Sequence, residues 1–155
     1  MTALLLTLAL AADPAPREVG NLVFEGVPES PAWLTERLGR YGEIRSASLV
    51  GFRADDPANG IYVTTRFGET SQLHRVAEPG AARHQLTFFD EPVRSVVPSP
   101  TDPDLVLLSR DVGGSEQYQV WLLNTKDGAA RQLSTGPGRA TGHSWSPDGT
   151  KIGWT

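Results

Sequence analysis

The chain has 155 residues, of which 39% are hydrophobic and 21% charged, and its formal net charge is -4. This composition is typical of one globular domain and excludes a disordered or fibrous chain. The acidic balance argues against a nucleic-acid partner, because phosphate binding requires clustered lysine and arginine. Lysine occurs only at Lys126 and Lys151. An arginine-rich binding surface is one interpretation of this bias, but the arginines are scattered along the chain, which favours biased codon usage.

The N-terminus carries a short apolar run from Ala3 to Ala12, with Ala9 and Ala11 placed like a small-residue cleavage site. This pattern predicts a secretory signal peptide over residues 1–12, and therefore a periplasmic or secreted protein. The alternative is an uncleaved apolar segment of a cytoplasmic protein, since no basic residue precedes the run. A bilayer requires about 20 apolar residues, so we expect no membrane span.

Residues 13–43 form an N-terminal extension with one helix expected over 31–41. Ser30 is a suitable N-cap, and Pro31 suits the first helical position. An apolar stripe and a terminating glycine follow at Leu34, Leu38, Tyr41 and Gly42. The extension is therefore expected to present one amphipathic helix.

From residue 44 onward, short apolar and β-branched runs alternate with Gly, Pro, Asp and Asn, as in an all-β region. These runs repeat. Gln85–Thr87 recurs as Gln132–Ser134, and Ser99-Pro100 recurs as Ser146-Pro147, both 47 residues later. At the same spacing, Leu73–Val76 matches Val120–Leu123, whereas Ile61–Arg66 and Leu105–Arg110 align at a spacing of 44. The difference predicts hairpin turns that differ by three residues.

A period of about 40–50 residues with four strands in each unit is typical of β-propeller blades. In the repeat, an inner strand such as Val93–Val97 precedes an S-P-D-G type of turn, and three further segments follow. The predicted fold class is all-β: an incomplete β-propeller of about two and a third four-stranded antiparallel blades, preceded by one helix. The blades are expected over 44–91, 92–139 and 140–155. Propellers close with more blades, so we expect the chain to be a fragment.

Ser144 is the one candidate nucleophile, because "GHSWS" (142–146) resembles the G-x-S-x-G motif of serine hydrolases. That motif requires a second small residue and a turn from a strand into a helix. Here Trp145 and a turn follow, and then another strand, expected over Lys151–Trp154. The 47-residue repeat places Ser144 opposite Val97 on an inner strand. We therefore interpret Ser144 as a blade residue.

The other candidate sites also have simpler structural interpretations. Metal-binding histidines and a calcium site are weak hypotheses, because the histidines are widely separated and the aspartates fall in predicted turns. The residues concerned are His74, His84, His143, Asp55, Asp56, Asp102 and Asp104. The Gly136–Gly138 segment lacks the ending of a phosphate-binding loop. We expect no catalytic residue, no metal and no cofactor in this chain.

The four tryptophans could form a surface that stacks against carbohydrate. Three of them, Trp121, Trp145 and Trp154, fall at predicted strand positions, whereas Trp33 lies in the predicted helix. Packing between blades is the simpler interpretation of the three strand residues.

Several longer stretches carry a family resemblance. "TRFGETSQLHRV" (65–76), "RHQLTFFDEPVRSV" (83–96) and "WSPDGTKIGWT" (145–155) follow the helical "PAWLTERLGRYGEIRSAS". Together they resemble the N-terminal propeller of the prolyl oligopeptidase family of serine peptidases, in particular its bacterial dipeptidyl-aminopeptidase and acylaminoacyl-peptidase-like members. The S-P-D-G motif is also shared by TolB-like periplasmic propellers.

The resemblance implies that the propeller caps a C-terminal α/β-hydrolase domain of the same parent chain and admits only short peptide substrates. The Ser, Asp and His triad of that domain matches no position here, so we expect residues 1–155 to lack peptidase activity. The alternative is a TolB-like, non-enzymatic propeller that serves as a protein-interaction scaffold.

Overall fold

The computed structural model describes residues 14–155, and the predicted signal peptide over 1–12 lies outside the described residues. The chain divides into two units, Met1–Ile44 and Arg45–Thr155.

The described part of the first unit consists of a small hairpin and one helix. Strands β1 (Arg17–Val19) and β2 (Leu22–Phe24) pair antiparallel. The Arg17 guanidinium stacks 4.2 Å from the centre of the Phe24 ring. Helix α1 spans Ala32–Gly42, one residue later at each end than the expected 31–41.

The expected capping of α1 is wrong. Pro31 is the N-cap, and its carbonyl accepts the first helical amides, from Leu34 at 2.9 Å and Thr35 at 3.2 Å. No side chain caps the helix, so Ser30 lies outside it. Proline has no amide hydrogen and fixes its own φ, and at this position it provides a carbonyl rather than the first helical turn.

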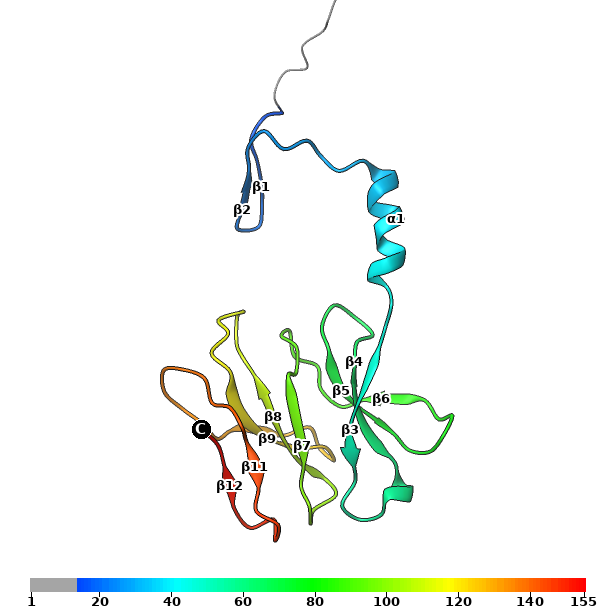
Figure 1. Cartoon of the computed structure of the whole chain (residues 1–155), viewed down its shortest axis with the longest axis vertical. Helices are drawn as coiled ribbons and strands as arrows, with labels where there is room; N and C mark the ends of the chain where they lie inside the picture. Colours follow the sequence, from blue (N-terminus) through cyan, green and yellow to red (C-terminus); the bar gives the residue numbers. More distant parts are fainter. Residues whose placement is uncertain (1–13) are drawn as a thin grey trace, which may run out of the picture. The chain divides into compact units, whose positions relative to one another are not determined.

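The second unit is built from antiparallel β-sheets that follow one another along the chain (Figure 1). Blade 1 contains β3 (Ala47–Phe52), β4 (Ile61–Thr65), β5 (Gln72–Val76) and β6 (Arg83–Gln85), with a short 3-10 helix, Pro57–Asn59, before β4. Blade 2 contains β7 (Ser95–Pro98), β8 (Leu105–Arg110), β9 (Gln119–Asn124) and β10 (Ala130–Gln132). β11 (Ser144–Trp145) and β12 (Ile152–Gly153) form a two-stranded sheet that we call blade 3.

Within each four-stranded sheet the strands pair in chain order, as in a propeller blade. Figure 1 shows that the first strand of blade 2, β7, lies between β3 and β11, the first strands of the other two blades. The fold is therefore the predicted one: an incomplete β-propeller preceded by one helix.

Two apolar layers hold the blades together. The layer between blades 1 and 2 is buried around Tyr62, Leu73, Val93, Val106, Leu108 and Leu123. The layer between blades 2 and 3 contains Leu107, Val120 and Ala140, packed against residues that include Leu122, Trp145 and Ile152. Successive residues of a strand point to opposite faces, so blade 2 supplies Leu107 to one layer and Leu108 to the other.

The expected alignment of β4 with β8 is wrong by one residue. Thr65 pairs with Gln72 in blade 1, and Arg110 pairs with Gln119 in blade 2. Because Gln72 and Gln119 are equivalent at a spacing of 47, Thr65 is equivalent to Arg110, a spacing of 45 rather than 44. A shift of one residue exchanges the two faces of a strand, so only this register keeps the apolar layers continuous.

The predicted inner strand Val93–Val97 also begins too early. The strand runs from Ser95 to Pro98, and Val93 precedes it. The Val93 amide donates instead to the carbonyl of Ser71 in blade 1 at 2.8 Å, and the Val93 side chain is buried between the blades. Ala140 repeats this arrangement, with its amide donating to Tyr118 at 2.8 Å. The segment before each inner strand therefore links one blade to the next.

Candidate functional site

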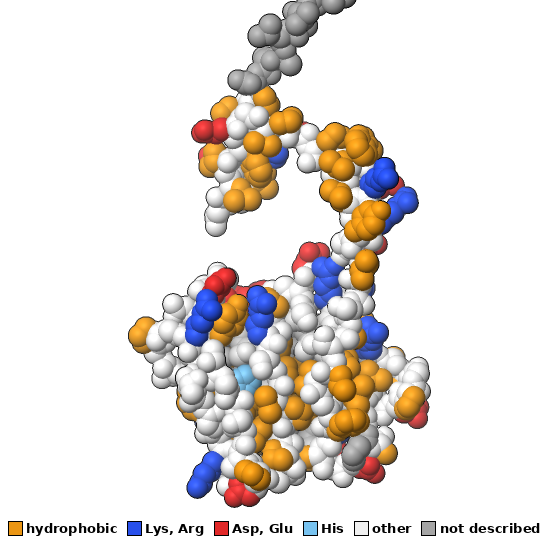
Figure 2. Space-filling view, in the orientation of Figure 1, with side chains coloured by type: hydrophobic (Ala, Val, Ile, Leu, Met, Phe, Trp, Pro, Cys, Tyr) orange, Lys and Arg blue, Asp and Glu red, His pale blue; other side chains and the backbone are white. Residues whose placement is uncertain are grey.

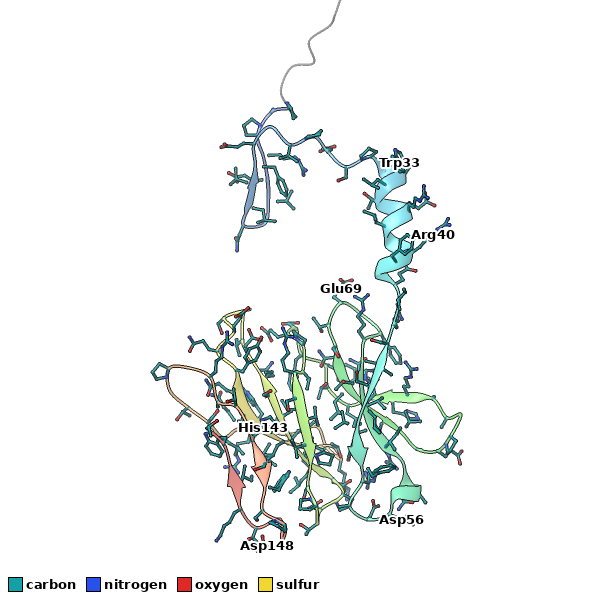
Figure 3. All side chains as sticks on the ribbon, in the orientation of Figure 1. Trp33, Arg40, Asp56, Glu69, His143 and Asp148 are labelled. Atoms are coloured by element: carbon teal, nitrogen blue, oxygen red, sulfur yellow. The ribbon has the colours of Figure 1, made fainter. Side chains whose placement is uncertain are left out.

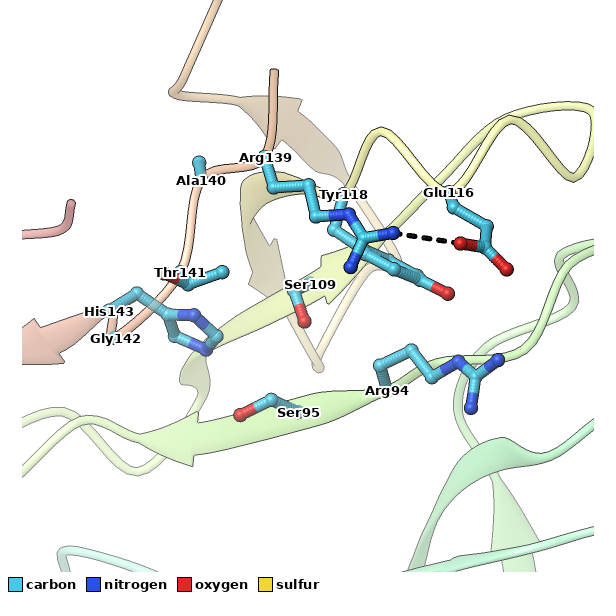
Figure 4. Close-up of a pocket in the computed structure, with 10 residues that line it drawn as sticks. All are labelled: Arg94, Ser95, Ser109, Glu116, Tyr118, Arg139, Ala140, Thr141, Gly142 and His143. Atoms are coloured by element: carbon cyan, nitrogen blue, oxygen red, sulfur yellow. Dashed lines mark hydrogen bonds and ion pairs between the residues drawn. The ribbon is translucent and has the colours of Figure 1, made fainter.

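A pocket with a volume of about 450 Å³ lies between blade 2 and the segment that leads into β11. Ser95 comes from β7 and Ser109 from β8, while Tyr118 immediately precedes β9. Arg139 to His143 form the opposite wall. Figure 4 shows these residues around the opening of the pocket. Figure 2 shows basic side chains close to a hydrophobic one at the upper left of the second unit.

Two arginines are held on the ring of Tyr118. The guanidinium carbons of Arg94 and Arg139 each lie 5.6 Å from the ring centre, within the range of a cation–π interaction. Arg139 also forms an ion pair with Glu116 at 2.7 Å. Arg94 has no ion pair to a carboxylate among residues 14–155 in this structure. The pocket therefore carries one uncompensated positive charge.

His143 lines the same pocket and is buried, with 7% of its surface exposed. Burial lowers the pKa of its imidazole below the usual value, so the ring is neutral at pH 7. Its Nε2 atom is buried and has no hydrogen-bond partner within the described part of the chain. Other buried side-chain nitrogens in this part of the chain, such as Nε2 of His74 and Nε1 of Trp121, share this property.

Little in the sequence indicates this site. Arg94 and Arg139 belong to a set of arginines scattered along the chain, and Tyr118 and Glu116 lie in no recognised motif. Arg94 follows Val93 and Arg139 precedes the equivalent residue Ala140, and this closeness to equivalent positions before two inner strands is the available signal. The ring of Tyr118 brings the two arginines together, and only the blade register places this ring between them.

The three histidines lie in different environments, although His74 and His84 are on the neighbouring strands β5 and β6. His74 is fully buried, its Nδ1 lies 3.0 Å from the carbonyl oxygen of Gln72, and its ring meets Phe67 edge-on at 4.7 Å. Burial lowers the pKa of His74. His84 is exposed on β6. Among residues 14–155, no group of three or more His, Cys, Asp or Glu side chains is arranged to hold a metal ion.

Two of the candidate calcium-binding aspartates do meet across a blade boundary. Asp55 of blade 1 and Asp104 of blade 2 both contact the guanidinium of Arg53, at 3.2 Å and 3.3 Å. The hydrogen bond from Arg53 is the main reason that the pKa of Asp55 is lowered. The cation between these carboxylates is thus an arginine, and the cluster joins the blades.

The remaining aspartates cap turns, as the sequence predicted. Asp56 accepts a hydrogen bond from the amide of Ala58 at 2.8 Å, and Asp102 from the amide of Asp104 at 2.9 Å. In the S-P-D-G turn, Asp148 accepts from the amide of Thr150 at 3.1 Å. Asp56 and Asp148 lie at the same end of the second unit (Figure 3).

Ser144 lies in β11, where it pairs with Gly153 of β12. It is exposed, and the chain continues from β11 through a turn into β12 rather than into a helix. This is the blade position predicted from the repeat. The predicted second strand, Lys151–Trp154, is shorter and spans only Ile152–Gly153.

The glycine-rich segment Gly136–Gly138 is fixed by side-chain hydrogen bonds to Gly138. The amide of Gly138 donates to Gln117 at 2.7 Å, and its carbonyl accepts from Gln119 at 2.9 Å, so two glutamines hold this loop.

Trp121 and Trp145 pack between blades, as expected. Trp154 does not: it follows β12 and is 42% exposed. Trp33 is exposed on α1.

No protein-family model matches the chain, and no curated protein matches its sequence. Within residues 14–155, α1 is the longest helix, and no helix combines the length and apolar character that a membrane crossing requires.

Proposed function

We propose that this chain is the substrate-gating propeller of a serine peptidase of the prolyl oligopeptidase type. In this proposal, the hydrolysis of short peptides takes place in an α/β-hydrolase domain of the same parent chain, outside residues 1–155. The sequence resemblance supports the proposal. Its "TRFG" stretch covers the end of β4 and the start of the turn into β5, and its "RHQLT" stretch contains β6.

The position of Ser144 supports the part of the proposal that places no catalytic residue in this chain. A nucleophilic serine requires a nearby base and oxyanion donors at a turn from a strand into a helix. Ser144 is instead paired with Gly153 within a sheet. The chain then contributes selection of substrates by size, and the chemistry belongs elsewhere. A periplasmic or secreted location is part of the same proposal and rests on residues 1–12.

The proposal is tested on the parent protein with two substrates that share one cleavable sequence, a short peptide and the same sequence within a folded protein. We expect the intact parent to cleave only the short peptide, and a variant that lacks the whole propeller but keeps hydrolase activity to cleave both substrates. Ser144→Ala in the intact parent is expected to retain full activity. Loss of activity in Ser144→Ala, or equal cleavage of both substrates by the intact parent, would contradict the proposal.

A TolB-like scaffold is the second candidate. The S-P-D-G turn favours it, because TolB-like propellers share this motif and Asp148 here accepts a hydrogen bond from the amide of Thr150 at 3.1 Å. Its test is the same parent protein, in which absence of peptidase activity would favour the scaffold.

A further inference from the structure

We propose that the pocket between blade 2 and β11 binds a carboxylate group, with Arg94 as the principal ligand-binding residue. This inference goes beyond the proposed function, because it concerns binding by residues 94–143 and requires no hydrolysis. The first support is charge. Arg94 and Arg139 give two positive charges, and Glu116 compensates one of them. The chain as a whole has a net charge of -4, so the pocket is opposite in sign to the protein.

The second support is the fixed direction of the arginines. Long side chains normally lose conformational freedom when they bind a ligand, and this loss weakens binding. Here the Tyr118 ring already holds Arg94 and Arg139 at 5.6 Å from its centre. A guanidinium presents paired N–H donors that match the two oxygens of a carboxylate. The cost of ordering the Arg94 side chain is therefore reduced before any ligand arrives.

The third support is the polar lining. The hydroxyl-bearing residues Ser95, Ser109 and Thr141 line the pocket and supply further hydrogen-bond donors. The imidazole of His143 lies in the same wall. The volume of about 450 Å³ is within the usual range for a small-ligand site. These features fit an anionic head group with a short polar or aliphatic body.

The charge count favours a carboxylate over a phosphate. One uncompensated guanidinium matches one negative charge, whereas phosphate dianions are usually held by several basic groups. The carboxylate has two possible sources, the C-terminus of a short peptide or a free organic acid. Both present the same group to Arg94, and the experiment distinguishes them.

The test is an NMR titration of the isotope-labelled full chain, followed at the amides of Thr141 and Gly142. The probes are N-acetyl-trialanine, its C-terminal amide, succinate and inorganic phosphate. We expect saturable shifts with the free acid and none with the amide. Tighter binding of the peptide acid than of succinate assigns the site to peptide C-termini, and the reverse assigns it to free organic acids. Equal binding of acid and amide, or tighter binding of phosphate than of both carboxylates, would overturn the proposal.

The variants separate this role from a structural one. Arg94→Gln should weaken carboxylate binding about tenfold to hundredfold, the usual effect of losing a charged hydrogen bond. Arg131→Gln, at an exposed position on β10, is the matched control and should bind as the wild type does. Arg94→Lys keeps the charge but loses the paired N–H donors, so its affinity for the carboxylate should lie between those of the wild type and Arg94→Gln. This variant provides the test if Arg94→Gln does not fold.

Glu116→Gln provides a gain of binding. The substitution removes the carboxylate that occupies Arg139, so the second guanidinium becomes available and binding should tighten several-fold. Damage to the fold would not strengthen binding. Weaker binding in Glu116→Gln, or equal losses in Arg94→Gln and Arg131→Gln, would contradict the assignment.

Discussion

The hydroxyl of Ser134 donates a hydrogen bond to the side-chain oxygen of Gln119 at 2.7 Å and accepts one from the amide of Val120 at 2.8 Å. Blade 1 contains the same arrangement. Thr87 donates to Gln72 at 2.7 Å and accepts from the amide of Leu73 at 2.9 Å. The end of the repeated Q-L-T and Q-L-S motif is thus a structural clamp that closes each blade on its third strand.

Replacing Ser134 with alanine should destabilise the chain by about 1–3 kcal/mol, because the change leaves a buried amide and the Gln119 oxygen without their partner. Ser134→Thr introduces the residue that blade 1 uses at this position and should cost less. The measurement is urea unfolding followed by circular dichroism.

Thr135→Ala is the matched control for this prediction, because Thr135 is the exposed neighbour of the buried Ser134. It should unfold at the wild-type urea concentration. Equal destabilisation by Ser134→Ala and Thr135→Ala would show that the clamp contributes nothing specific.

Stability should fall as the pH is lowered from 7.5 to 5.5. Burial lowers the pKa of His74 and His143 in the folded chain, so the unfolded chain binds protons more readily at these positions. For such groups the stability is complete above the unfolded pKa, near 6.5, and is lost as the pH falls toward the lower folded pKa. The melting temperature measured across this range should therefore decrease.

The histidine variants identify the source of this pH dependence. The melting temperature of a double variant, His74→Gln with His143→Gln, should change less between pH 7.5 and 5.5 than that of the wild type. His84→Gln changes an exposed histidine and should keep the wild-type slope. The same slope in all three proteins would contradict the explanation. The lowered pKa values of Asp55 and Asp148 affect stability only at more acidic pH, since those carboxylates titrate below the usual range.

Gly149→Ala should destabilise blade 3. Gly149 has a φ of +68°, and a β-carbon at this position would collide with the side chain of Thr101 in blade 2. We expect a cost above the roughly 1–2 kcal/mol of the backbone conformation alone. Gly128→Ala isolates that backbone effect, because Gly128 has a φ of +77° and open space around it. Chemical denaturation should rank Gly149→Ala as the less stable of the two.

Ser144 should not react as a nucleophile. A fluorophosphonate probe applied to the full chain is expected to leave Ser144 unlabelled, because the residue lies in a strand pair without the surroundings that activate a serine. Mass spectrometry of the peptide that contains Ser144 provides the measurement. Labelling that disappears in Ser144→Ala would reverse this interpretation.

The blades could be predicted from the sequence because a side-chain hydrogen bond closes each of the two four-stranded blades. The residues that form this bond recur at a fixed spacing, and this spacing is visible as a sequence repeat. Gln72 and Gln119 belong to the same repeat, because they too are separated by 47 residues. The register of β4 against β8 was wrong because residue similarity alone does not specify which face of a strand is buried. That choice is made by the pairing of Thr65 with Gln72 and of Arg110 with Gln119.

The pocket could not be predicted in the same way. Arg94, Tyr118 and Arg139 come from three separate segments and form no local motif. They meet because the amides of Val93 and Ala140 tie the start of each inner strand to the preceding blade. Asp55 and Asp104 are a parallel case. Sequence placed both in turns, but only the packing of the blades brings them to Arg53.

The most direct test of the gating proposal is to determine the coding sequence that follows the codon of Thr155. If the chain is a gating propeller, we expect further blades and then a strand, a G-x-S-x-G motif and a helix, with aspartate and histidine after them in that order. A reading frame that ends, whether at once or after further blades, without this motif would contradict the assignment to a serine peptidase.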